Sequence, residues 1–168
     1  MACAAVLAFT GQPVKSFLFP LVVTQMQLIE GLRWTNALPE DILALLGKLT
    51  IYLQPAIALL EAGQTQWIPL YAGSQAIVEL LLGSRDSRFV VADDGHLAWK
   101  WLPKFESLGL LPYWVAIIFA SRILYPRWLN LLLLGLLIYY VTFHHQYDTW
   151  GSLWCVSVNI LWIYYLLR

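Results

Sequence analysis

The chain has 168 residues, of which 60% are hydrophobic and only 12% are charged. Soluble domains carry about 25% charged residues, so this composition excludes an ordinary soluble core. Ten acidic and ten basic residues give a formal net charge of zero. Without a basic patch we expect no nucleic-acid partner. The composition predicts an integral, multi-pass membrane protein whose main partner is the lipid bilayer.

Apolar segments of membrane-crossing length follow one another along the chain. A helix needs about 17–25 apolar residues to cross a bilayer core of roughly 30 Å. Met1–Thr10 is apolar but too short to cross, so we interpret it as a helical stub. The predicted spans are Ser16–Trp34, Asp41–Leu60, Trp67–Gly83, the shorter Leu108–Arg122, Arg127–Phe143 and Trp150–Leu167. They predict one all-α transmembrane domain over residues 1–168, with six full spans plus the stub in a seven-helix plan.

Residues 84–105 interrupt the apolar pattern. Two runs rich in β-forming residues, RFVVA and HLAWKW, flank the turn-forming sequence DDG, which is typical of a β-hairpin. An open sheet edge is incompatible with hydrocarbon. We therefore expect a small extramembrane hairpin near residues 88–101 that packs on the helices, with Trp99 and Trp101 on one face, resting on the membrane surface.

The alternation of spans gathers the ionisable residues of the helices near one membrane surface. We name side B the side that holds the turns at 35–40 and 144–149 and the hairpin; side A is the opposite side. Glu30, Lys48 and Glu79 each lie within about two helical turns of side B. Ionisable residues within spans are typical of functional sites, so the sequence predicts a polar cavity open to side B.

Glu30 is the centre of this predicted cavity. Gln27, Glu30 and Trp34 are spaced three and four residues apart and share one helix face. A charge in hydrocarbon is costly unless it is paired, so we expect an ion pair between Glu30 and Lys48. Gln54 adds a polar group beside a proline within a helix. The candidate cavity residues are Gln27, Glu30, Trp34, Lys48, Gln54, Glu79, His96, His144, His145, Asp148 and Trp154.

These residue types leave three functions open. The favoured one is binding or translocation of a proton, an ion or a small amphiphile, with Glu30 as acceptor and Lys48 as its counter-charge. The second is an intramembrane lipid hydrolase. In it His144 or His145, with Asp148 and Glu30 or His96, holds a metal or acts as a base, although adjacent helical histidines point about 100° apart. The third is a structural or assembly subunit of an oligomer or membrane complex. We expect no cofactor, and a metal only in the second case.

Short motifs resemble those of a known family. QMQLIEGLRW resembles the Q-x-x-E-G-x-x-W segment of an uncharacterised group of polytopic membrane proteins from bacteria, algae, protists and giant viruses, and GHLAWKW and WGSLWC resemble further landmarks of its algal and viral members. The resemblance covers most of the chain and implies a seven-helix fold that begins before residue 1, but no activity. It carries over Gln27, Glu30, Gly31, Trp34, Gln54–Pro55, His96, Trp99, Gly151–Ser152 and Trp154–Cys155.

Overall fold

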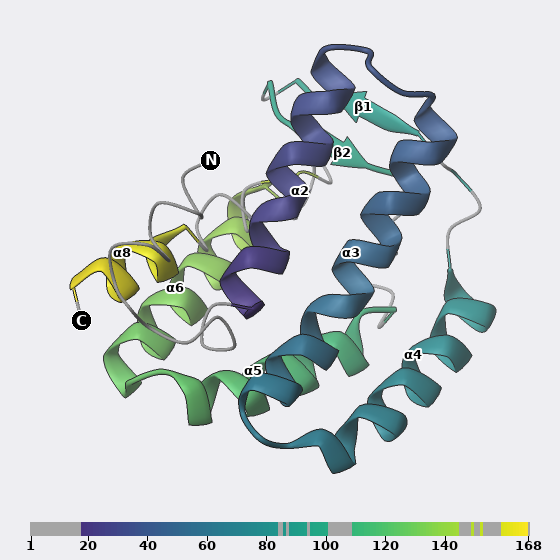
Figure 1. The fold of residues 1–168 in the computed structure, drawn as a ribbon. Helices are drawn as coiled ribbons and strands as arrows, with labels where there is room; N and C mark the ends of the chain where they lie inside the picture. The colour runs from purple at the N-terminus through teal and green to yellow at the C-terminus, as the bar shows by residue number, and fades with distance from the viewer. Residues whose placement is uncertain are drawn as a thin grey trace.

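The protein is mostly helical, with one small antiparallel sheet (Figure 1). A computed structural model describes residues 18–83, 86, 88–93, 95–100, 109–144, 149, 152 and 159–167. The helices are α2 (Leu18–Trp34), α3 (Glu40–Glu61), α4 (Ile68–Leu82), α5 (Leu111–Leu124), α6 (Arg127–His144) and α8 (Ile160–Leu167). A 3-10 turn, η2 (Thr65–Trp67), precedes α4, and the strands are β1 (Phe89–Val91) and β2 (Leu97–Trp99).

Five of the predicted spans correspond to described helices. The helix starts follow familiar rules: acidic residues occupy the first turn of α3 and prolines open α4 and α5, where they are tolerated because those N–H groups have no helical partner. Only the end of the last predicted span is described, as α8, and the stub lies outside the described residues. Within the described chain, α3 alone is long and apolar enough to cross a membrane, so six full spans stay a prediction.

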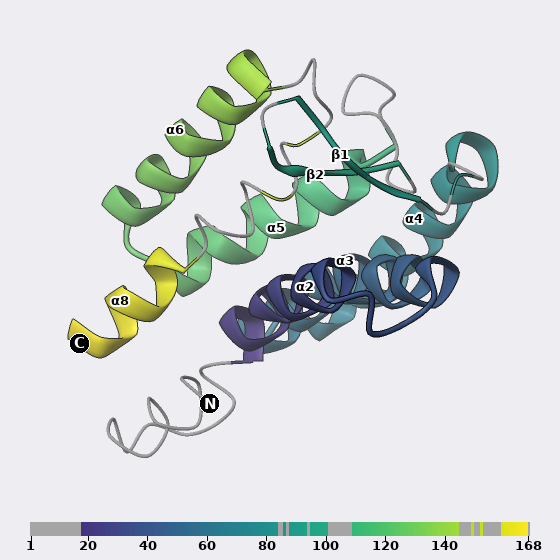
Figure 2. The ribbon, with the colours of Figure 1, turned by 90° about the horizontal axis from the view of Figure 1, so that it is seen from above.

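Helix α3 is the centre of the packing. It lies antiparallel to α2 across a tight turn and packs most extensively on α2, then on α5 and α4. Figures 1 and 2 show the α2–α3 pair on one side of the molecule and α5 with α6 on the other. Met26 of α2, Leu43 and Leu59 of α3 and Leu129 of α6 are almost fully buried in the core between these helices.

The β-hairpin is confirmed, and it is anchored in the core. Phe89 pairs with Trp99 and Val91 with Leu97, and Gly95 takes the positive φ of 78° that the turn requires. The ring of Trp99 is only 3% exposed. The expectation that Trp99 rests on the membrane surface is therefore wrong, because this ring packs into the hydrophobic core; Trp101 lies outside the described residues.

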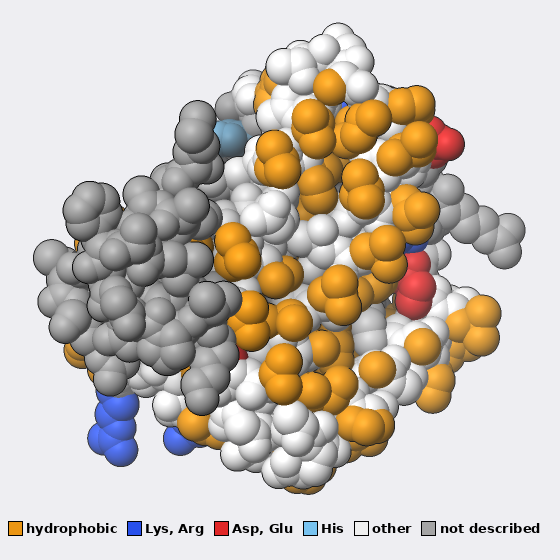
Figure 3. Space-filling view, viewed as in Figure 1, with side chains coloured by type: hydrophobic (Ala, Val, Ile, Leu, Met, Phe, Trp, Pro, Cys, Tyr) orange, Lys and Arg blue, Asp and Glu red, His pale blue; other side chains and the backbone are white. Residues whose placement is uncertain are grey.

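Large apolar side chains cover the outside of the helices, while several polar side chains are buried. Leu80 of α4 is 86% exposed, whereas Gln75 of the same helix is 4% exposed and Gln54 of α3 is fully buried. Figure 3 shows the apolar side chains spread over the outer faces of α2 and α3. The described helices thus place much of their apolar surface outward and amide groups inward.

Candidate functional site

Glu30 lies at the meeting point of three distant parts of the chain. It is half-buried, one turn from the end of α2. The indole N–H of Trp99, in β2, donates to Glu30 Oε1 at 3.0 Å. The hydroxyl of the buried Ser152 donates to the same carboxylate, and the imidazole of His96 interacts with it electrostatically. We call Glu30, His96, Trp99 and Ser152 the Glu30 cluster.

The cluster holds a carboxylate with neutral donors. An ionised carboxylate has about four acceptor positions, and the described residues supply two donors, from Trp99 and Ser152. Among the described ion pairs, no lysine or arginine contacts Glu30. The imidazole of His96 lies near this carboxylate. The cluster can therefore accept a proton, a cation or another hydrogen-bond donor.

The predicted ion pair between Glu30 and Lys48 is wrong, since within the described chain Lys48 pairs with Glu79. Lys48 Nζ lies 2.7 Å from Glu79 Oε1. The two residues lie on α3 and α4, which pack together, whereas Glu30 has turned to the hairpin. Depth from side B placed Lys48 level with Gln27 and within reach of Glu30, but it did not define which helix face each residue occupies.

A chain of hydrogen bonds extends the Lys48–Glu79 pair along α3 and α4. The hydroxyl of Tyr52 donates to Glu79 Oε2 at 2.5 Å, and the hydroxyl of Tyr71 donates to the backbone carbonyl of Tyr52 at 2.7 Å. We call Lys48, Tyr52, Tyr71 and Glu79 the α3–α4 network. Both charges are mostly shielded from solvent, so the tyrosine is needed to satisfy the carboxylate that the lysine neutralises.

Two buried glutamines tie α3 and α4 to the start of α5. Tyr113 donates to Gln54 Oε1 at 2.6 Å, and Gln75 Nε2 donates to the carbonyl of Gly109 at 3.1 Å. Gln54 was expected to line a cavity but is instead packed in the core. The sequence analysis missed Gln75, although it shares one face of α4 with Tyr71 and Glu79 at four-residue spacing, and that spacing was the available signal.

The remaining candidate cavity residues are Trp34, Gln27, His144, His145, Asp148 and Trp154. Trp34 is 56% exposed at the end of α2, outside the Glu30 cluster, and Gln27 is partly buried on the preceding turn. His144 ends α6, while His145, Asp148 and Trp154 lie outside the described residues. Within the described part of the chain, no group of three or more His, Cys, Asp or Glu side chains is placed to hold a metal.

The loop before the hairpin carries a separate, exposed charge pair. Arg88 donates two hydrogen bonds to the carboxylate of Asp86, at 3.0 and 2.8 Å. These bonds to the guanidinium lower the pKa of Asp86 below its ordinary value. Asp86 and Arg88 are close in sequence to His96 and Trp99, but no described contact joins them to the Glu30 cluster. The pair is therefore separate from the site.

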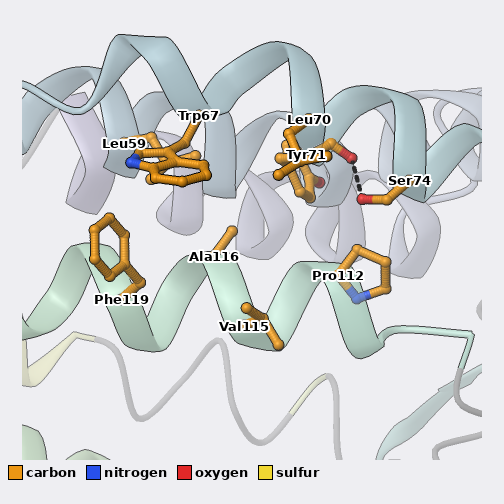
Figure 4. Close-up of a pocket in the computed structure, with 9 residues that line it drawn as sticks. All are labelled: Leu59, Trp67, Leu70, Tyr71, Ser74, Pro112, Val115, Ala116 and Phe119. Atoms are coloured by element: carbon orange, nitrogen blue, oxygen red, sulfur yellow. Dashed lines mark hydrogen bonds between the residues drawn. The ribbon is translucent and has the colours of Figure 1, made fainter.

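An apolar pocket of about 340 Å³ lies between α4 and α5. Figure 4 shows Trp67 and Phe119 at one end and Ser74 and Pro112 at the other; the two aromatic rings meet edge to face, 6.4 Å apart. Tyr71, which belongs to the α3–α4 network, forms part of the wall. The pocket offers contact to hydrocarbon and no charged group.

Comparisons of the chain with models of protein families, with curated proteins and with solved structures find no match. The function is therefore argued from the Glu30 cluster and its surroundings.

Proposed function

We propose that this chain is a multi-pass membrane protein that binds and translocates a proton or a small cation through the Glu30 cluster, entering from side B. The observation that carries the proposal is the half-buried carboxylate of Glu30, which is held by the neutral donors Trp99 and Ser152 and lies near the imidazole of His96. Such a carboxylate has geometry fixed in advance and a charge that a proton or a cation can neutralise.

The distribution of side chains supports a membrane location. A soluble protein rarely exposes large contiguous apolar surface, yet Leu70, Ile77, Leu80 and Leu81 of α4 are all exposed. The same helix turns Tyr71 and Gln75 inward, where they hydrogen-bond to neighbouring segments. Apolar residues outward and hydrogen-bonded polar residues inward are what helices need in hydrocarbon. Helix α3, which can cross a bilayer by length and composition, adds to this support.

The experiment is proton flux in vesicles that contain the purified protein and a trapped pH-sensitive dye. A pH gradient is imposed, with valinomycin and potassium to compensate charge. We expect the wild-type protein to raise proton entry above that of protein-free vesicles. Glu30→Gln should return entry to the protein-free level, because the amide can still accept from Trp99 but cannot carry a proton.

Two control variants separate chemistry from folding. Glu40→Gln removes an acid that is paired with Arg33 at the α2–α3 turn, and it should leave flux unchanged. Trp99→Phe keeps the charge of Glu30 and removes one donor, so we expect altered flux rather than its loss. If Glu30→Gln admits protons as fast as the wild type and only has a lower melting temperature, the proposal fails. The cluster then has a structural role, in which its hydrogen bonds hold the hairpin against α2. Repeating the gradient with sodium or tetramethylammonium distinguishes a proton from a small cation.

This structural role is the second candidate function. The Glu30 cluster joins α2, the hairpin and Ser152 through hydrogen bonds, which is what a structural or assembly role requires. The third function, a metal-dependent lipid hydrolase, depends on the side chains of His144, His145 and Asp148, and we propose no reaction for it.

A further inference from the structure

A second cavity, of about 550 Å³, lies between α5 and α6. Its body is apolar and includes Ile118 of α5 and Leu134 and Leu137 of α6. At the turn that joins the two helices its lining changes to Arg122, Arg127 and polar neighbours. The volume lies in the range of pockets that hold small-molecule ligands, about 300–1,000 Å³. This cavity is far along the chain from Glu30 and shares no residue with the Glu30 cluster.

The polar end of the cavity is positively charged. Arg122 lies in the last turn of α5 and Arg127 is the first residue of α6. Both are exposed, and neither forms an ion pair with a described residue. The first turn of α6 contains no acidic residue, so its helix dipole adds to the positive potential.

Asn130 fixes the geometry of this end. Its side-chain amide donates to the backbone carbonyls of Ser121, Tyr125 and Pro126, at 3.2, 3.0 and 3.3 Å. These bonds cover the carbonyl oxygens at the end of α5, which would otherwise repel an anion, and they hold the turn between the two arginines. The result is a positively charged rim above an apolar cavity.

The dimensions match one leaflet of a bilayer. The lining extends along α6 from Arg127 to Leu137, ten residue steps or about 15 Å at the helical rise of 1.5 Å per residue. A leaflet contributes half of a hydrocarbon core of roughly 30 Å. A hydrocarbon chain lying in the cavity would therefore place its head group at the arginines, on side A.

We propose that this cavity binds one anionic phospholipid of the surrounding bilayer, with an acyl chain between α5 and α6 and the phosphate on Arg122 and Arg127. Arginine suits this role because its planar guanidinium donates two hydrogen bonds to a phosphate group. The proposal rests on the membrane location proposed above but not on proton or cation transport at Glu30, so the Glu30→Gln variant should bind the lipid like the wild type.

The test is lipid retention, measured by native mass spectrometry of the protein in a mild non-ionic detergent. The protein is mixed with equal amounts of phosphatidylglycerol and phosphatidylcholine that carry the same acyl chains. We expect about fivefold or more phosphatidylglycerol on the wild type, since each arginine near the interface contributes roughly a factor of five in attraction to an anionic lipid. The double variant Arg122→Gln/Arg127→Gln should lose this preference.

Two further variants keep the test decisive. Arg88→Gln removes an exposed arginine elsewhere and should keep the wild-type preference. Leu134→Trp fills the apolar part of the cavity from a partly exposed position and leaves both arginines in place, so it should lose bound lipid even where the double arginine variant fails to fold.

Three results would overturn the proposal. The first is equal retention of the two lipids by the wild type, which indicates an unselective lipid-facing groove. The second is an unchanged preference in the double arginine variant or in Leu134→Trp. The third is a rise in melting temperature with inorganic phosphate alone that equals the rise with phosphatidylglycerol, which indicates a simple anion site.

Discussion

The hydroxyl of Tyr113 reaches the side-chain carbonyl of Gln54, which is fully buried in α3. A buried amide that loses its partner keeps the full penalty of leaving water. The amide nitrogen of Gln54 has no described hydrogen-bond partner, so the bond from Tyr113 is the one described hydrogen bond of this side chain.

Tyr113→Phe should lower the free energy of unfolding by about 1–3 kcal/mol, because it leaves the Gln54 carbonyl unsatisfied while keeping the ring. The measurement is unfolding in mixed detergent micelles, followed by circular dichroism. Gln54→Leu/Tyr113→Phe should lose less than the sum of the two single variants. Tyr139→Phe, at an exposed position of α6, is the control. A loss in Tyr113→Phe no larger than that in Tyr139→Phe would contradict this account.

Residue chemistry alone predicted part of the site. Glu30, Lys48 and Glu79 stand out because ionisable groups are rare in apolar segments, and the structure places each of them in a polar cluster. Their pairing was not predictable. Depth along a helix follows from residue number, but the face that meets a neighbour depends on how the helices pack, and here the hairpin takes the position beside Glu30 that the sequence assigned to Lys48.

At the scale of elements, length and composition are enough to locate the helices, because an apolar run with proline or acidic residues at its start has few other stable conformations. The hairpin was predicted from its turn residues and β-forming runs. The packing of the hairpin on α2 was not predicted, because Trp99 is buried against Glu30, which lies 69 residues away in the chain.

Two glycines of this region, Gly73 within α4 and Gly83 at its C-terminal cap, should change the stability of the protein in opposite directions when replaced by alanine. A Cβ on Gly83, which caps the helix, would come within 2.3 Å of the backbone oxygen of Glu79, while a Cβ on Gly73 would meet nothing within 4 Å. Backbone cannot move aside as a flexible side chain can, so Gly83→Ala must displace the end of α4 and with it Glu79, the partner of Lys48.

We expect Gly83→Ala to lower the melting temperature because of the clash. Gly73→Ala should raise the melting temperature and add up to about 1 kcal/mol to the free energy of unfolding, because alanine favours a helix over glycine. Both variants are compared by thermal unfolding in the same detergent. The double variant Gly83→Ala/Lys48→Met tests whether the destabilisation comes from a broken Lys48–Glu79 ion pair. If it does, Lys48→Met should lower the melting temperature less in the Gly83→Ala background than in the wild type. Equal melting temperatures for the two alanine variants would refute the clash.

For the whole molecule, the proposed membrane location makes a geometric prediction about α3. Asn36 in the turn before this helix and Gln66 in the segment after it should lie on opposite sides of the bilayer. Single cysteines at these positions, in a chain whose Cys3 and Cys155 are replaced by serine, are treated in sealed vesicles with a membrane-impermeant maleimide. We expect one position to react at once and the other only after the vesicles are opened. Labelling of both from outside would contradict a crossing by α3.

The contact between Trp99 and Glu30 also has a consequence for biosynthesis. Trp99 leaves the ribosome 69 residues after Glu30, which is roughly 3 to 14 seconds at 5–20 residues per second, and Ser152 follows later still. In the proposed membrane location, α2 would meet the membrane during that interval without either of these two donors to Glu30. We therefore expect Glu30 to stay in contact with water until the hairpin is made, so that docking of the hairpin on α2 is a late step in folding.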